Sequence, residues 1–230
     1  FERALFCVTD FTSPRAWATA LLGIDDYLEC FDGDRRVSQV RENLSERLMG
    51  LFDASSADGW LWFEDILTYA NARLSHALIR SGHAMRNERI RDAGLASLRW
   101  LISMQTSESG VFRPIGTNGF YRRGGNPAQF DQQPIEAQAT VSACIAAYGI
   151  TDERFWLNEA RRAFDWFLGR NDVGVAVYDP STGGCHDGLH IDRINQNEGC
   201  ESTLAFLLAL TEMQVVLSAS GTGRIKGVAQ

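Results

Sequence analysis

Acidic residues that could do chemistry stand at the start of a long uncharged segment. The stretch DQQPIEAQATVSACIAAY places Asp131 and Glu136 on either side of Pro134 and then carries no further charge up to Tyr148. Proline is tolerated in the first turn of a helix, so a helix is predicted to begin near Gln133. Glu136 would lie in that first turn, where backbone N–H groups and the helix dipole favour an anion.

Paired carboxyl groups are the minimum apparatus for cleaving a glycosidic bond, because one protonates the leaving oxygen while the other acts as base or nucleophile. Asp131 and Glu136 are the favoured pair. Each glutamate could instead simply cap its helix. A recurring position at the start of uncharged segments favours a functional role, and it makes further candidates of Glu64, Glu201 and, in a later loop, Asp187.

Other side chains near these carboxylates could contact a sugar. Aromatic rings can stack on pyranose faces and amides can bind pairs of hydroxyls, although such residues can also be core or turn residues. Arginines in the first long loop could bind phosphate or a uronate, or form a solvated surface patch. The substrate-binding candidates are Trp62, Tyr121, Arg122, Gln132, Gln133, His186 and Asn197.

Metal binding and nucleotide chemistry lack sequence support. The run HDGLHID from His186 to Asp192 contains metal-ligand types, but Gly188 breaks the helical frame that would align its two histidines. The sequence has no GxSxG, P-loop or strand-borne GxGxxG either. We therefore expect no metal and no cofactor.

Hydrophobic periodicity predicts the elements that carry these residues. Two kinds of helix alternate along the chain: helices that are apolar nearly all round, as expected for buried helices, and helices with one apolar face. The first kind is predicted at residues 11–31, 60–79, 133–148 and 201–217, and the second at 35–52, 88–104 and 153–168. This alternation predicts an all-α fold, an α/α toroid or an arc of one, with inner and outer helices.

Two connections, 107–130 and 170–197, are far longer than usual helix-to-helix loops and are predicted to be functional. Both lead into inner helices, so they should gather on the same rim as Glu64, Glu136 and Glu201. We expect one domain over residues 1–230, with 218–230 as a tail. Because the first residue is Phe1, the chain could be a fragment of a longer protein.

Bulk composition excludes several classes of partner. The chain has 230 residues and a formal net charge of -7, which argues against nucleic acid as a ligand. Its five cysteines cannot all pair and are interpreted as reduced thiols of a cytoplasmic protein. No apolar run long enough to span a membrane is expected.

Several motifs together resemble a bacterial helical domain that is found alone or C-terminal to a glycosyltransferase and is similar to the six-hairpin glycosidase superfamily. The resemblance covers residues 11–213. Its motifs are SPRAW from Ser13, WFE from Trp62, YANARL from Tyr69, FDQQPIEA from Phe130, TGGC from Thr182, DGL from Asp187 and NEGCEST from Asn197.

This resemblance implies a carbohydrate ligand, because the superfamily holds hydrolases, phosphorylases, lyases and epimerases. Epimerases of this shape use paired histidines on inner helices, and the predicted helix starts carry none. Two hypotheses remain: a glycoside hydrolase-like enzyme of carbohydrate metabolism that uses paired carboxylates, or a non-catalytic glycan-binding or scaffolding module associated with a glycosyltransferase. A helical protein-interaction solenoid is a third possibility.

Overall fold

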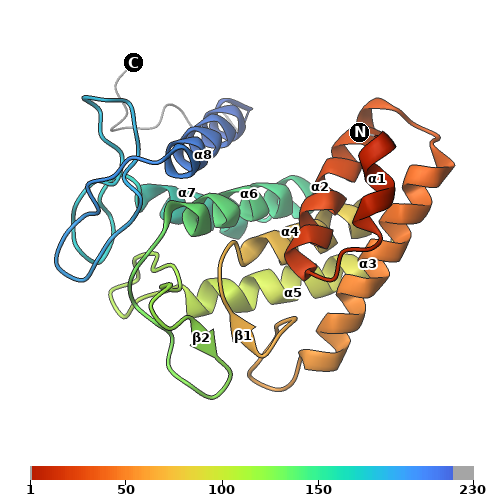
Figure 1. Ribbon diagram of the computed structural model, residues 1–230, viewed down its shortest axis with the longest axis horizontal. Helices are drawn as coiled ribbons and strands as arrows, with labels where there is room; N and C mark the ends of the chain where they lie inside the picture. Colours follow the sequence, from red (N-terminus) through yellow and green to blue (C-terminus); the bar gives the residue numbers. More distant parts are fainter. Residues whose placement is uncertain (1, 220–230) are drawn as a thin grey trace. The chain divides into compact units, whose positions relative to one another are not determined.

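The computed structural model describes residues 2–219, and it is predominantly helical (Figure 1). Its contacts group the chain into two compact units, residues 1–65 with 72–101 and residues 66–71 with 102–230. Helices α1 (Glu2–Val8), α2 (Pro14–Cys30), α3 (Arg35–Ser55) and α4 (Ala72–Ala84) belong to the first unit, and α5 (Glu88–Met104) runs from the first unit into the second. The prediction of a single domain stays a prediction.

The first unit is a helical bundle in which α2, α3 and α4 contact one another. As predicted, α3 buries one face, and Leu44 and Leu48 on that face are fully inaccessible. Asp34 caps α3 by accepting hydrogen bonds from the N–H groups of Arg36 and Val37, which satisfies two of the donors left open at a helix start. The helix at Glu2–Val8 was not predicted.

The predicted helix at 60–79 is wrong in its first half. Helix α4 begins only at Ala72, and the residues before it form turns and the short strand β1 (Ile66–Leu67). Trp60, Trp62 and Phe63 form an aromatic cluster, with Trp62 packed against Phe63 and Trp100 at centroid distances of 5.1 and 6.0 Å. Burial of these rings explains the apolar sequence without a helix.

The second unit contains β2 (Tyr121–Arg122), α6 (Pro134–Thr151), α7 (Arg154–Asp165) and α8 (Cys200–Ala219). Strands β1 and β2 pair in antiparallel orientation. Helix α6 packs against both α7 and α8, and it starts at Pro134 with Gln133 as its N-cap. Ten of its residues are buried, which agrees with the prediction of an inner helix; α7 buries a single face, as predicted.

Helix α8 departs from its prediction. It is uncharged over most of its length, yet only one face packs in the core, while Leu204, Leu207, Leu208 and Val215 are exposed. By length and composition it is apolar enough to cross a membrane, contrary to the expectation of no such segment; a third of that stretch is buried within the structure. Residues 218 and 219 continue this helix, and the rest of the predicted tail lies outside the described residues.

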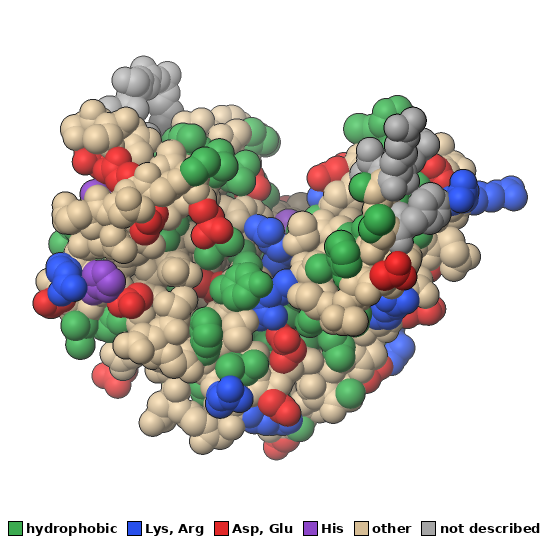
Figure 2. Space-filling model, viewed as in Figure 1, with side chains coloured by type: hydrophobic (Ala, Val, Ile, Leu, Met, Phe, Trp, Pro, Cys, Tyr) green, Lys and Arg blue, Asp and Glu red, His purple; other side chains and the backbone are tan. Residues whose placement is uncertain are grey.

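The surface carries both signs of charge. Figure 2 shows acidic and basic side chains interspersed over the visible face, so the net charge of -7 does not gather there into one field. The five cysteines are all free, as predicted.

Candidate functional site

Backbone pairing joins the second long loop to the start of α6. The N–H of Gln132 donates to the carbonyl of Leu189 at 3.0 Å, and the N–H of Leu189 donates back at 2.9 Å. Gly188 makes this approach possible, because a Cβ there would lie 2.3 Å from the Gln132 carbonyl oxygen. The second long loop therefore lies against the start of the inner helix α6, as the sequence predicted.

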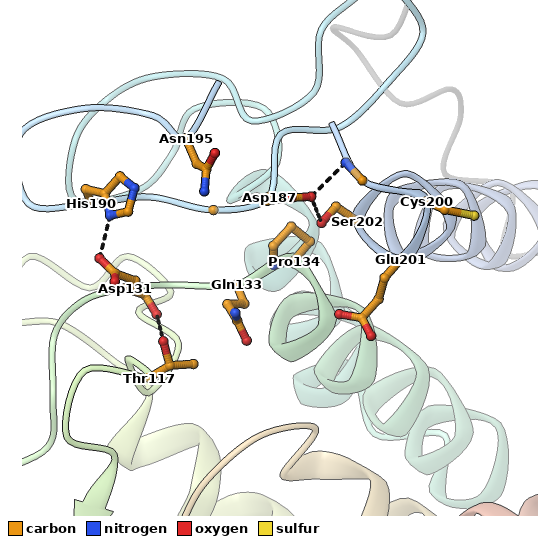
Figure 3. A pocket seen from close by; sticks show the side chains of 12 residues that line it. Thr117, Asp131, Gln133, Pro134, Asp187, His190, Asn195, Cys200, Glu201 and Ser202 are labelled. Atoms are coloured by element: carbon orange, nitrogen blue, oxygen red, sulfur yellow. Dashed lines mark hydrogen bonds and ion pairs between the residues drawn. The ribbon is translucent and has the colours of Figure 1, made fainter. Parts of the chain in front are cut away.

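A cavity of about 400 Å³ opens between this loop and the first turns of α6 and α8 (Figure 3). Its volume is in the range typical of small-ligand sites. Three carboxylates face it, Asp131, Asp187 and Glu201, each from a different segment of the second unit. The other lining residues are Thr117, Gln133, Pro134, Gly188, His190, Asn195, Gly199, Cys200 and Ser202.

Asp131 forms a close pair with His190. The Asp131 Oδ1 atom lies 2.6 Å from His190 Nδ1, and the two side chains keep 44% and 29% of their surface exposed. The N–H of Thr117 donates to the backbone carbonyl of Asp131 at 2.9 Å and holds the residue in place. A partly exposed carboxylate–imidazole pair of this kind can move a proton to or from a bound ligand.

Asp187 is held by donors from the start of α8. Ser202 Oγ donates to Oδ1 at 2.7 Å and the N–H of Gly199 donates to the same oxygen at 2.8 Å, while the amide of Asn197 donates to Oδ2. Desolvation alone would raise the pKa of Asp187, but these hydrogen bonds outweigh it and hold the pKa below its usual value. Asp187 therefore presents a fixed negative charge to the cavity.

Glu201 is an exposed residue in the first turn of α8, and Figure 3 shows its side chain extending from that helix beside α6. Gln133 and Asn195 add amide groups to the same cavity. Gln133 makes no capping hydrogen bond to α6. The cavity therefore combines three carboxylates, an imidazole and two amides.

Glu136 is a buried anchor rather than a cavity residue, which corrects its expected place in the catalytic pair. Only 1% of its surface is exposed. Its Oε1 accepts from the N–H of Asn71 at 3.1 Å, and its Oε2 accepts from Asn71 Nδ2 at 2.9 Å and Gln105 Nε2 at 3.2 Å. The carboxylate ties the residue before α4 and the chain just after α5 to the first turn of α6.

Glu64 also differs from its prediction. It lies in the irregular segment before α4 instead of at a helix start, and it belongs to the first unit. Its Oε2 accepts from Arg15 Nη1 at 2.7 Å. The repeated acidic start inferred from the sequence is therefore present at α6 and α8 but not at α4.

The predicted substrate-binding residues divide into several groups. Gln133 lines the cavity. Gln132 is fully buried, accepting from Trp166 Nε1 at 2.7 Å and donating to Asp172 at 2.7 Å, so its amide is used within the core. Asn197 supports Asp187, and His186 lies near Glu198, 3.7 Å from its Oε1.

The remaining candidates do not line the cavity. Trp62 is completely buried, so its ring faces are taken up by packing, as in the core alternative. Tyr121 and Arg122 form β2. Arg113, one of the arginines of the first long loop, forms an ion pair in which its Nη2 atom lies 2.6 Å from Asp172 Oδ1.

Sequence reasoning considered Asn195 as an amide for sugar hydroxyls but missed His190 as a cavity residue. Both come from the loop between α7 and α8, and their side chains face Asp131 and Gln133 only because the Gln132–Leu189 pairing folds that loop back. The histidine was weighed only as a metal ligand in helical spacing. A preference for polar residues close to the DGL motif could have found it.

Comparison with solved structures identifies the fold class. The structure resembles that of the GH76A alpha-1,6-mannanase from Salegentibacter sp. HEL1_6, with a TM-score of 0.65 and 13% sequence identity, over 92% of this chain and 56% of that one. The predicted all-α class of α/α-toroid type is thereby confirmed. No protein-family profile and no curated protein matches the chain. The chain spans little more than half the length of the mannanase it resembles.

Proposed function

We propose that this chain is a glycan-processing, glycosidase-like domain that binds an oligosaccharide in the cavity at the starts of α6 and α8. The observation that carries the proposal is the convergence of Asp131, Asp187 and Glu201 on one cavity of about 400 Å³. The glycosidase-type fold supports the same class of ligand. Amides from Gln133 and Asn195 supply the hydrogen bonds that sugar hydroxyls require.

In this proposal, Asp131 and Glu201 are the working carboxyl groups. One protonates the glycosidic oxygen as its bond to the anomeric carbon breaks, and the other takes a proton from the attacking water, so that two hydroxyl groups replace the glycosidic bond and the water. His190 positions Asp131 and exchanges its proton through the 2.6 Å contact. Asp187, held ionised by its donors, stabilises positive charge that develops on the sugar ring.

The experiment is cleavage of a panel of oligosaccharides by the wild type and by Asp131→Asn and Glu201→Gln. α-1,6-linked mannan oligosaccharides are the first to test, because the structural neighbour is a mannanase of that linkage. We expect each substitution to lower turnover by at least about 100-fold while glycan Kd changes by less than about 5-fold. If both variants cleave the oligosaccharides at the wild-type rate, this assignment is refuted.

A second candidate is a non-catalytic glycan-binding module that acts with a glycosyltransferase. It is favoured by one observation: hydrogen bonds hold two acidic residues of this region, Asp187 and Glu136, as fixed acceptors. Saturable glycan binding without turnover in the wild type would support this alternative. The glycosyltransferase partner and the cytoplasmic location stay predictions.

A further inference from the structure

Three potential metal ligands meet in the loop between α7 and α8, and none of the three lines the cavity. Asp179, His186 and Glu198 each offer a ligand atom, and these atoms lie within 4.8 Å of one another. We refer to these residues as the loop triad. Asp179 and His186 are 7 residues apart in sequence, and His186 and Glu198 are 12 apart, so the three residues do not form a short metal-binding motif.

His186 contributes an unsatisfied ring nitrogen to the loop triad. Its Nδ1 atom is buried and has no hydrogen-bond partner among the residues that the structure describes. The nearest acidic atom, Glu198 Oε1, lies 3.7 Å away, which is too far for a hydrogen bond. Buried polar atoms without a partner are rare because their desolvation is uncompensated. This atom therefore points to a ligand.

Hydrogen bonds hold the two carboxylates of the triad in place. Asp179 Oδ1 accepts from both the N–H and the hydroxyl of Ser181 at 2.7 Å. Glu198 Oε2 accepts from Thr182 Oγ1 at 2.8 Å, which leaves Oε1 as the atom nearer to His186. Outer contacts of this kind commonly orient the carboxylates of metal sites.

We propose that the loop triad binds a divalent transition-metal cation, with Zn²⁺ as the best fit. An imidazole with two carboxylates suits zinc, whereas Ca²⁺ and Mg²⁺ prefer oxygen ligands throughout. Ligands of a tetrahedral zinc site lie about 3.3 Å apart, given Zn–N and Zn–O distances of about 2.0 to 2.1 Å. The 3.7 Å between Nδ1 and Oε1 needs only a small inward shift to reach that value.

A cation bound by the loop triad would affect the cavity through the residues next to its ligands. His186 directly precedes Asp187, and Glu198 directly precedes Gly199, whose N–H donates to Asp187 at 2.8 Å. The metal would thus join the two strands of chain that hold Asp187 in the cavity wall. The site is a positioning device, and it stands independently of whether the cavity cleaves a glycan.

The test uses the histidine ring nitrogens, which NMR resolves individually because the chain has only four histidines. Zn²⁺ is titrated into the metal-free protein while ¹H–¹⁵N ring correlations and calorimetric heat are recorded. We expect one equivalent to bind and the Nδ1 resonance of His186 to shift, while that of the exposed His83 stays in place. Glu198→Gln and Asp179→Asn should each weaken Zn²⁺ binding by at least about 10-fold.

Control variants separate the triad from other zinc ligands. His83→Asn removes an exposed histidine outside the triad and should leave the affinity unchanged, and Cys7→Ser with Cys30→Ser removes two exposed thiols. Circular dichroism confirms that each variant is folded. Zinc binding that leaves the His186 resonance unmoved, binding equally strong in Glu198→Gln and Asp179→Asn, or no saturable binding at all would each overturn the proposal.

Discussion

Replacing Glu136 by Gln tests whether this residue is an anchor or a catalyst. The carboxylate accepts hydrogen bonds from the backbone and side chain of Asn71 and from Gln105. A glutamine keeps one oxygen. In the better of the two amide orientations, the glutamine oxygen accepts from the side chains of Asn71 and Gln105. The NH₂ group of the glutamine then faces the backbone N–H of Asn71, which loses its acceptor.

The size of the effect follows from these contacts. One buried N–H left without an acceptor costs about 1 to 3 kcal/mol, and turning two charge-assisted bonds into neutral ones adds about 1 kcal/mol, partly offset by relief from burying a charge. We expect Glu136→Gln to lower the free energy of unfolding by about 2 to 4 kcal/mol. Glu136→Ala, which removes the acceptor of the Asn71 and Gln105 donors, should lower it by at least about 3 to 5 kcal/mol.

Urea unfolding followed by circular dichroism measures these differences. Glu201→Gln is the matched control, because Glu201 occupies the same first-turn region of α8 but is exposed, and its change should stay within about 0.5 kcal/mol. Our reasoning fails if Glu136→Gln is as stable as Glu201→Gln. Loss of glycan turnover at unchanged stability would instead return Glu136 to a catalytic role.

The remaining predictions concern the loop, the cavity and the core. Asp187 has a lowered pKa in the folded protein, so its contribution to stability is complete above the unfolded pKa of about 3.9 and is lost as the pH falls through the lower folded pKa. Urea unfolding between pH 7 and pH 3 should therefore show that the free energy of unfolding falls more steeply with decreasing pH in the wild type than in Asp187→Asn. Gly188→Ala places a Cβ against the Gln132 carbonyl, so it should lower the free energy of unfolding by about 1 to 3 kcal/mol and weaken glycan binding. Gly149→Ala is the control: this position in α6 has open space around it, so the substitution should be neutral or stabilising by up to about 1 kcal/mol in the same denaturation assay. Trp62→Ala should destabilise by about 3 to 5 kcal/mol without changing the glycan Kd of the folded fraction, and a Kd change of 10-fold or more would restore the sugar-stacking role. Zn²⁺ at about 100 times its Kd should slow hydrogen exchange in the loop between α7 and α8 by up to about 100-fold, equivalent to about 2.7 kcal/mol, and unchanged exchange would contradict the metal site.

The sequence alone was sufficient for the parts of the fold that depend on local pattern. Pro134 after an N-cap position placed the start of α6 correctly, and the apolar spacing of α3 and α7 predicted which face each buries. The lengths of the two irregular stretches also pointed to the region that forms the cavity. These features are local because a helix and its buried stripe repeat every few residues.

Tertiary structure decided which polar groups meet. A periodic pattern cannot distinguish a first-turn glutamate that faces a cavity, such as Glu201, from one that is buried among hydrogen-bond donors, such as Glu136. The aromatic residues before α4 satisfied a helical pattern equally well, but packing of Trp62 against Trp100 and Phe63 accounts for them without a helix.

The loop between α7 and α8 is the clearest case of this division. Its length marked it as functional, but nothing in its sequence indicated that His190 would reach Asp131, 59 residues away, or that His186 would face Glu198. The first contact lies next to the backbone pairing between Leu189 and Gln132, and the second lies next to the hydrogen bond from the N–H of Asp187 to the carbonyl of Asn197. Neither backbone interaction has a periodic signature in the sequence. Local patterns in the sequence specified most of the helices and the residue types available for chemistry. Only the folded chain determined which residues become partners, because partners are set by distances through space.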